Sequence, residues 1–465
     1  MKNKILNGLK ISFYGGAKEV TGSNYLVESP ENKILIDCGL FQGSKIGEDR
    51  NYQPFSYDPK SIDALIVTHA HLDHVGRIPK LVREGFRGKI FSTAPTRELA
   101  ELMMDDSLGV LGKESRRNGK KLIYEKKDIK ETMSKWESAE YLKNFQIGGF
   151  NIRLIDAGHI LGSAMAEITY KNPSNSSGQE KIVFTGDLGN PLTPLLPDPQ
   201  PVKDADYLII ESTYGDRAHE NREDSGLKLE RIIEETISKN GVLMIPAFSL
   251  ERTQKLLYEI NNLVENGRIP RVPIFLDSPL SIKATAVYKK YQNYFNDEAK
   301  EIILSGDDLF NFQGLKSCLT TEDSKAINDV EPPKIIIAGS GMSNGGRIVH
   351  HEHRYLSNKN NTLLLVSFQA AGSLGRRLQD KEKLVKILGD TIRVNARIEE
   401  IQGFSCHPDM DELFDFVRQT ADTVKKVFVA QGEPRASSFF SQRVRDNLGI
   451  EAIVPELGET YELGV

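Results

Sequence analysis

The most informative part of the sequence is a run of six residues in which four side chains can bind a metal ion. The run is His69-Ala70-His71-Leu72-Asp73-His74, and it directly follows the apolar segment 64–67. Imidazole nitrogens and carboxylate oxygens are common protein ligands of zinc and related metals. A lone histidine is more often an ordinary core residue, but that explanation does not account for the whole cluster. The run therefore predicts a site for one or two metal ions.

Three more residues of the same types follow other strand-like segments. They are Asp37, His159 and Asp187, and each has a glycine within two residues of it. Any one of them alone is more often a turn residue or a helix cap than a ligand. Their shared position beyond the end of an apolar run favours convergence at one edge of a sheet.

Short runs of β-branched and other apolar residues recur through the first half of the sequence and predict buried strands in close succession. The predicted strands cover 10–14, 33–37, 63–68, 151–156, 181–185 and 207–211. The clearest helical pattern in this half covers 96–111. The charged stretch 113–145 is predicted to be a solvated helical insertion.

In the second half, strands alternate with helices. The predicted strands are 242–247, 273–276, 334–338 and 362–368, and the predicted helices are 222–238, 251–265, 281–295 and 345–357. This alternation is typical of βαβ units with a parallel sheet. Two later strand patterns, 393–398 and 426–430, flank a helical one at 409–420, and periodicity does not assign this tail to either half.

The composition is that of a soluble globular protein with two or three domains. The chain has 465 residues, of which 39% are hydrophobic and 27% charged, and this balance excludes intrinsic disorder. The formal charge of -5 means that any polyanion must be bound by local Lys and Arg side chains. Three separated cysteines and the lack of a signal peptide or membrane span predict a cytoplasmic location.

The metal-binding residues described above resemble those of the metallo-β-lactamase superfamily, an αββα sandwich with a two-metal, usually zinc, site. Later motifs look like those of its beta-CASP branch of zinc-dependent RNA nucleases. These motifs are Glu211 to Arg217, Ile245 to Phe248, Asp277 to Leu280, Gly341 to Arg347, Gln369 to Arg376 and Phe404 to His407. The resemblance implies a metallo-β-lactamase domain formed by 1–211 and 392–465, with an inserted βαβ beta-CASP cap at 212–391.

The resemblance also implies roles for individual residues. The first zinc would be bound by His69, His71 and His159, the second by Asp73 and His74, and Asp187 would bridge the two. Asp37 would orient a metal ligand. His407, paired with Glu211, would act as the general acid. The catalytic residues implied are therefore Asp37, Asp73, Glu211 and His407. RNA contacts are expected from four arginines: Arg252, Arg347, Arg376 and Arg377.

The activity implied by this resemblance is hydrolysis of single-stranded RNA through a hydroxide held by two zinc ions. The sequence does not decide between an endonuclease and a 5′ exonuclease. It also does not decide whether RNA or DNA is preferred, or whether the protein is a monomer or a homodimer. One residue departs from the family pattern. Where relatives usually carry His-Gly-Glu, this chain has Gln431-Gly432-Glu433, and an amide is a poor zinc ligand. We therefore expect the second zinc site to be weak.

Other functions account for fewer of these residues. An RNA-binding scaffold with a degenerate metal site is supported only by Gln431, and a metal-dependent (thio)ester hydrolase does not account for the beta-CASP motifs. The segment Gly341 to Gly345 fits a G-x-S-x-G nucleophile elbow, with Asp390 and His407 following in the required order. A serine hydrolase leaves the histidine cluster unexplained, and a dinucleotide site lacks its third glycine at Asn344.

Overall fold

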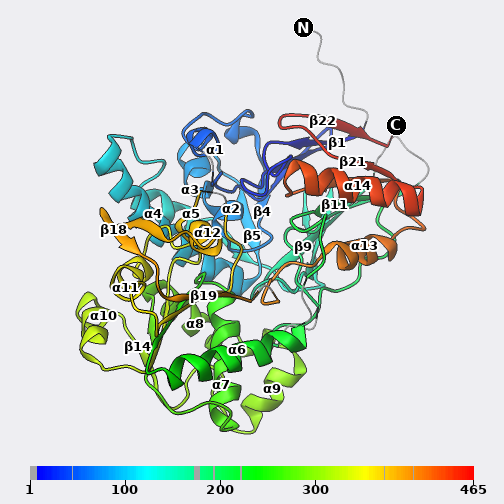
Figure 1. Cartoon of the computed structure of the whole chain (residues 1–465). Helices are drawn as coiled ribbons and strands as arrows, with labels where there is room; N and C mark the ends of the chain where they lie inside the picture. Colours follow the sequence, from blue (N-terminus) through cyan, green and yellow to red (C-terminus); the bar gives the residue numbers. More distant parts are fainter. Residues whose placement is uncertain are drawn as a thin grey trace. The chain divides into compact units, whose positions relative to one another are not determined.

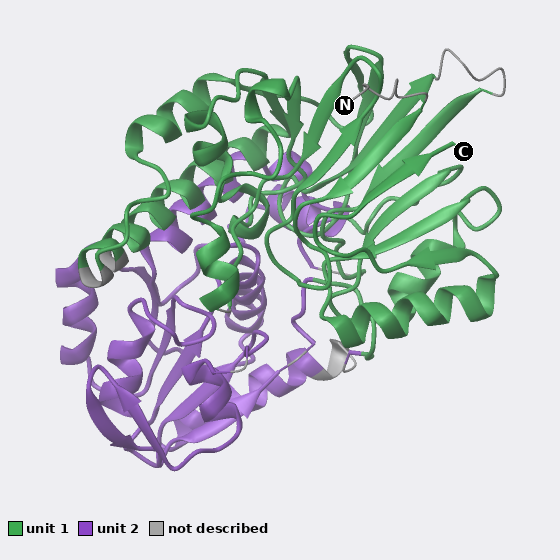
Figure 2. Cartoon of the chain, turned by 90° about the horizontal axis from the view of Figure 1, so that it is seen from above, with its two compact units in different colours: residues 1–193, 197–218, 407–465 green, residues 194–196, 219–406 purple. Residues whose placement is uncertain are grey.

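The computed structural model describes residues 8–43, 45–171, 178–191, 194–219, 222–370, 372–401 and 403–464. The chain divides into two compact units, which Figure 2 colours separately. Unit 1 comprises 1–193, 197–218 and 407–465, and unit 2 comprises 194–196 and 219–406. Each unit has its own sheets and its own buried hydrophobic cluster.

Unit 1 contains two seven-stranded sheets. In spatial order the first sheet is β22 (Thr460–Leu463), β1 (Leu9–Phe13), β2 (Tyr25–Glu28), β3 (Lys33–Ile36), β4 (Ala64–Ile66), β5 (Lys89–Ser92) and β6 (Trp136–Ser138). The second sheet is β21 (Glu451–Ile453), β20 (Lys426–Ala430), β11 (Tyr207–Glu211), β10 (Gln179–Phe184), β9 (Ala164–Lys171), β8 (Phe150–Asp156) and β7 (Asn144–Ile147).

The core of unit 1 lies between these two sheets. Alternate residues of a strand point to opposite faces, so Ile152 of β8 packs with Phe13 of β1 in the central cluster while Ile155 packs on the other side. On that outer side the second sheet packs against α13 (Met410–Arg418) and α14 (Pro434–Leu448), which lie over it in Figure 1.

Helices also cover the outer face of the first sheet, where Leu35 and Leu65 are fully buried. The helices between β3 and β6 in the sequence are α1 (Lys45–Arg50), α2 (Leu72–Val75), α3 (Ile78–Arg83), α4 (Ala94–Asn118) and α5 (Lys126–Ser134). The layers of unit 1 are therefore helix, sheet, sheet and helix, which confirms the predicted αββα sandwich.

Unit 2 is built on a six-stranded parallel sheet. Its spatial order is β14 (Leu315–Ser317), β13 (Ile274–Asp277), β15 (Lys334–Ala338), β12 (Val242–Pro246), β16 (Thr362–Leu365) and β19 (Arg397–Glu400). The α-helices of this unit are α6 (Arg222–Ser238), α7 (Arg252–Glu265), α8 (Pro279–Lys290), α9 (Asp297–Leu304), α10 (Thr321–Ala326), α11 (Ile348–Tyr355) and α12 (Leu374–Gln379). Strands and helices alternate along the chain, as the sequence predicted.

Two details between residues 391 and 406 differ from the sequence-based predictions. The predicted strand 393–398 instead spans the end of the hairpin β17 (Leu384–Ile387) and β18 (Asp390–Arg393) and the start of β19. Since β19 is hydrogen-bonded to β16, residues up to 406 group with unit 2, whereas the predicted boundary was 392.

The charged stretch 113–145 is not a helical insertion throughout. After α4 and α5 it contributes β6 to the first sheet, where Trp136 is buried and its indole nitrogen donates to Ser92. The prediction failed because the other residues of β6 are exposed, so charge alone did not show the strand. No helix in the described ranges is long and apolar enough to cross a membrane.

Candidate metal centre

The predicted metal ligands lie where strands of unit 1 end. In the second sheet β9 is antiparallel to both neighbours, so β8, β10, β11 and β20 all run in one direction and their carboxyl ends share an edge. These four ends are followed or closed by His159, Asp187, Glu211 and Gln431. In the first sheet, β3 is followed by Asp37 and β4 by the histidine cluster.

Four side chains form the first group of possible ligands: His69, His71, His159 and Asp187. His71 Nδ1 lies 3.1 Å from His69 Nε2 and 3.3 Å from His159 Nε2. The Asp187 Oδ2 atom lies 3.5 Å from His69 Nε2 and 3.6 Å from His159 Nε2. Ligands about 2.0–2.1 Å from a tetrahedral zinc ion are roughly 3.3 Å apart. The spacing of these four atoms therefore fits a single ion.

A second group is formed by Asp73, His74 and the other oxygen of Asp187. His74 Nε2 lies 3.3 Å from Asp187 Oδ1 and 3.8 Å from Asp73 Oδ2. The Gln431 amide nitrogen is 3.0 Å from His74 Nε2 and donates to Asp187 Oδ1 at 2.6 Å. Gln431 therefore contacts the atoms that would bind a second ion.

Asp37 supports the second group through a hydrogen bond to His74 and belongs to neither group of possible ligands. Its Oδ2 atom is 2.7 Å from His74 Nδ1, so the Nε2 atom of His74 faces the second group. Thr68 donates to the same carboxylate through its backbone nitrogen and its hydroxyl, both at 2.8 Å. Sequence reasoning missed Thr68, and its place directly before His69 was the only signal available.

The loop carrying Asp37 is tightly fitted against α2. Asp37 has φ 58°, a left-handed conformation that is costly for a residue other than glycine and that occurs often at functional sites. Gly39 packs so closely on the Asp73 carbonyl that a Cβ atom would overlap it. The fold thus requires glycine at 39 in order to bring Asp37 and α2 together.

Burial and neighbouring charge set the protonation of the cluster. Burial lowers the pKa of His71 to about 4 and that of His69 well below its usual range. Burial alone would raise the pKa of Asp187, but the neighbouring His74 and His69 hold it well below the ordinary carboxyl value. Neutral imidazoles and an ionised carboxylate are the forms that bind metal, so these three residues fit a divalent ion. His74 differs, because burial alone would lower its pKa but the neighbouring Asp187 and Asp37 carboxylates raise it well above the usual value, so His74 must release a proton to bind metal.

The predicted acid pair is also assembled in unit 1. His407 Nδ1 lies 3.0 and 3.1 Å from the two oxygens of Glu211, which is fully buried at the end of β11. The Leu188 backbone nitrogen donates to Glu211 Oε1 at 2.7 Å and fixes the carboxylate. The rings of His407 and His159 are 4.6 Å apart, so the pair lies beside the first ligand group.

The four predicted RNA-contacting arginines are in different environments. Arg347 bonds Asp277 and two backbone carbonyls, while Arg376 and Arg377 form ion pairs with Asp380 and Glu382. Arg252 is 9% exposed, and its Nε and Nη1 atoms have no hydrogen-bond partner among the described residues. Arg347 is therefore held as a structural residue, whereas Arg252 is not.

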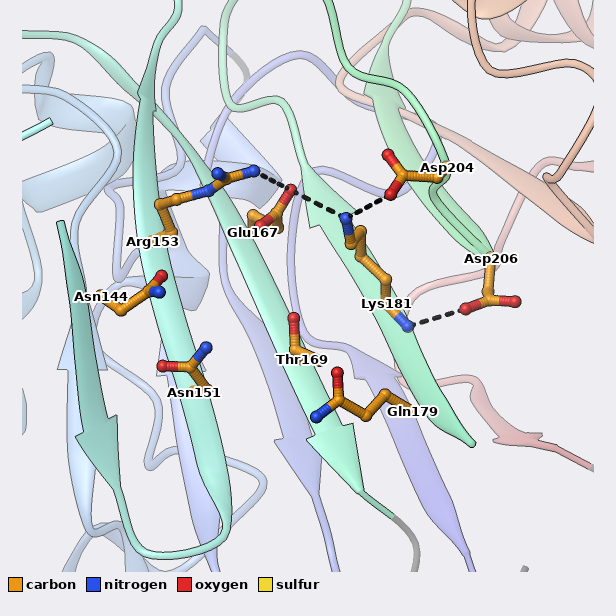
Figure 3. A pocket seen from close by; sticks show the side chains of 9 residues that line it. All are labelled: Asn144, Asn151, Arg153, Glu167, Thr169, Gln179, Lys181, Asp204 and Asp206. Atoms are coloured by element: carbon orange, nitrogen blue, oxygen red, sulfur yellow. Dashed lines mark hydrogen bonds and ion pairs between the residues drawn. The ribbon is translucent and has the colours of Figure 1, made fainter. Parts of the chain in front are cut away.

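Two other features could suggest different chemistry. The Ser343 hydroxyl donates to the buried Glu352 carboxyl, and Asp390 pairs with His353, so the elements of a serine triad are engaged elsewhere. A hollow of about 360 Å³ lies on the outer face of β7 to β10 (Figure 3). Its charged residues pair with one another, as in the bonds from Arg153 to Glu167 and from Lys181 to Asp204. No histidine or cysteine lines it, so it offers little for metal chemistry.

Comparisons with known families agree with this geometry. Residues 17–112 match the metallo-beta-lactamase superfamily and residues 253–378 match the Beta-Casp domain. Residues 391–455 match the Zn-dependent metallo-hydrolase RNA specificity domain.

Several curated proteins are similar over almost the whole chain. Ribonuclease TTHA0252 of Thermus thermophilus is 37% identical over 92% of each chain. Transcription termination factor FttA of Methanosarcina mazei is 32% identical over 95% of this chain and 70% of its own length. The RNase J-like protein of Methanocaldococcus jannaschii is 31% identical over 96% of this chain and 98% of its own.

A solved structure, a protein of unknown function from Enterococcus faecalis V583, covers 98% of this chain and all of its own with a TM-score of 0.54 and 12% identity. That likeness concerns the fold alone. Successive parts of the chain match the two family models, and the relatives are similar over almost its whole length. The chain therefore belongs to the beta-CASP branch of the metallo-β-lactamase superfamily.

Proposed function

We propose that this protein is a metal-dependent ribonuclease that hydrolyses phosphodiester bonds of single-stranded RNA at a centre of two zinc ions. The observation that supports it best is the pair of ligand groups sharing Asp187, with the acid pair His407 and Glu211 beside them. The substrate class is supported by relatives named as ribonucleases and by the RNA specificity domain match.

In this proposal His69, His71, His159 and Asp187 would hold the first ion, and Asp73, His74 and Asp187 would hold the second. When bound, the two ions would supply positive charge for the phosphoryl oxygens and activation of the attacking water. Asp37 holds His74 through Nδ1 and so directs its Nε2 atom at the second ion. Gln431 leaves that ion one strong ligand short, so the second site binds more weakly than the first.

The leaving oxygen requires a proton, and His407 is placed to supply it. Its Nδ1 atom faces the buried Glu211 carboxylate, so Nε2 is the ring atom that would carry the transferred proton. Glu211 stabilises the charged imidazole before transfer and keeps the ring oriented. Protonation of the 3′ oxygen leaves a 3′-hydroxyl on one product and a 5′-phosphate on the other.

Cleavage of end-labelled single-stranded RNA by purified, metal-analysed protein tests this function. We expect products with 5′-phosphate and 3′-hydroxyl ends, and no cleavage after treatment with a chelator. Cyclic-phosphate ends, or undiminished cleavage after chelation, would contradict the proposal. The lengths of the labelled products also separate internal cutting from 5′-terminal cutting, and a matched DNA strand tests the choice of substrate.

Gln431 favours a second candidate, an RNA-binding scaffold with an incomplete metal site. That function predicts RNA binding without cleavage at any zinc or manganese concentration, which the same assay detects. A homodimer and a cytoplasmic location remain predictions, to be tested by light scattering and by cell fractionation.

A further inference from the structure

The carboxyl edge of the sheet in unit 2 has the topology of a ligand site. The chain leaves β12 toward β13 on one side, and it leaves the neighbouring β15 toward β16 on the other. Where connections after adjacent parallel strands depart in opposite directions, a crevice opens at the carboxyl ends of these strands, and ligands commonly bind there. A ligand of unit 2 is therefore expected at the loops that follow β12, β15 and β16.

Two aromatic side chains are exposed at this edge. Phe248 follows β12 and is 38% exposed, and Phe368 follows the neighbouring β16 and is 49% exposed. Gly341, after β15, allows the Phe248 ring to pack on the backbone, since a Cβ atom there would be 2.9 Å from the ring. The Gln369 amide donates to the Gly341 carbonyl at 2.9 Å, so Phe368 is held in the same loop cluster.

The same three strand ends carry polar atoms that lack partners among the described residues. They are the Nε and Nη1 atoms of Arg252, at the start of α7, and the hydroxyls of Ser340 and Ser367. Buried polar atoms are rarely left unsatisfied, and donors of a charged group such as the Arg252 guanidinium are the most costly to leave without an acceptor. An anion that accepts from Arg252 would remove this cost.

We propose that this edge binds a stretch of single-stranded RNA, with Phe248 and Phe368 stacking on bases and Arg252 bonding a phosphate. Exposed aromatic faces beside a cation are the combination that binds single strands, and stacking tolerates any base. The inference rests on the proposed function, since RNA is taken to be the substrate. It adds residues that select unpaired bases, and it implies little sequence preference.

Fluorescence anisotropy with labelled single-stranded RNA tests the stacking. All proteins carry Asp73→Ala, which prevents cleavage, and the added changes are Phe248→Leu, Phe368→Leu or the control Phe439→Leu. Phe439 is also about half exposed, on α14 of unit 1. We expect roughly tenfold weaker binding for the first two variants and no change for the control.

A strand of the same length with abasic sites completes the stacking test. Phe248→Leu and Phe368→Leu should bind the abasic strand as the parent does, because no base remains to be stacked. Full affinity of both variants for normal RNA would overturn the proposal, and so would an equal loss on the abasic strand. If the parent itself binds no RNA, the proposed function fails and not only this inference.

The phosphate contact has its own readout. Loss of one phosphate contact lowers the slope of log affinity against log salt by about 0.7 for a single strand. Arg252→Gln should show this decrease, whereas Arg268→Gln should not, since Arg268 forms an exposed ion pair with Glu230. An unchanged slope for Arg252→Gln would remove Arg252 from the proposed site.

Discussion

His407 belongs to neither group of candidate ligands, and its Nδ1 atom contacts the Glu211 carboxylate. Replacing it with alanine should leave all seven donor atoms of both metal groups in place. We expect His407→Ala to keep its metal and to lose rate by roughly 10² to 10⁴, the range of a general acid.

Single-turnover cleavage and metal analysis of the same preparation check this prediction. His353→Ala is a suitable control. His353 lies on α11 of unit 2, where it pairs with the exposed Asp390 of the hairpin strand β18. Wild-type rates for His407→Ala would refute its role as the acid, and loss of metal would show that it acts as a ligand instead.

Gln431 is the residue at which this chain departs from its family. Its amide contacts His74 and Asp187, but a neutral amide binds zinc more weakly than an imidazole does. We expect the native protein to keep between one and two zinc ions after dialysis, with activity rising when zinc or manganese is added. Gln431→His should keep two ions and respond less to added metal. Two ions retained by the native protein, with no change in the variant, would disprove this interpretation.

At the scale of elements, strand direction explains how distant residues converge. The ends of β8, β10 and β20 meet at one edge, so residues separated by more than two hundred positions become neighbours. Helices contribute less to the centre, and among the described helices α2 carries the candidate ligands Asp73 and His74. Because the candidate ligands lie mostly on loops at strand ends, substituting them should leave the apolar core intact.

Helix α11 of unit 2 contains a buried carboxyl that makes stability depend on pH. Burial raises the pKa of Glu352 to about 8 from its usual value near 4.5. Between these values the folded state binds one more proton than the unfolded state, so stability falls as pH rises. Its contribution reaches about 1.4 kcal/mol per pH unit at the steepest point.

Glu352→Gln removes this titration and keeps the acceptor for the Ser343 hydroxyl. Urea unfolding at pH 5.5, 6.5 and 7.5 should therefore show a steeper loss of stability in the wild type than in the variant. Parallel pH profiles of the two proteins would show that Glu352 is ionised in the folded state.

At the scale of the whole molecule, the hydrophobic clusters do not depend on the ligand cluster. The core of unit 1 is made by the facing sheets, and unit 2 has a separate cluster around its own sheet. We expect a chelator to abolish cleavage and lower the melting temperature by a few degrees through loss of the bound ion. The far-ultraviolet circular dichroism at 25 °C should not change, and added zinc should restore cleavage. Unfolding on chelation would mean that metal is required for the fold.

The sequence by itself determined the ligand types, their order and the two kinds of architecture. Four candidate ligands were visible from residue type and short spacing at 69–74, and His159 and Asp187 from their position after apolar runs. The strands were visible because burial imposes apolar runs. Gln431 was also identified from the sequence as a departure from the family pattern.

Only the tertiary structure decided which partners these residues have. It engages Arg347 with Asp277, leaves the Nε and Nη1 atoms of Arg252 without a hydrogen-bond partner among the described residues, and pairs β19 with β16. It also places the Gln431 amide on His74 and Asp187. These outcomes depend on contacts between segments far apart in the chain, and local periodicity contains no information about which distant segments will meet.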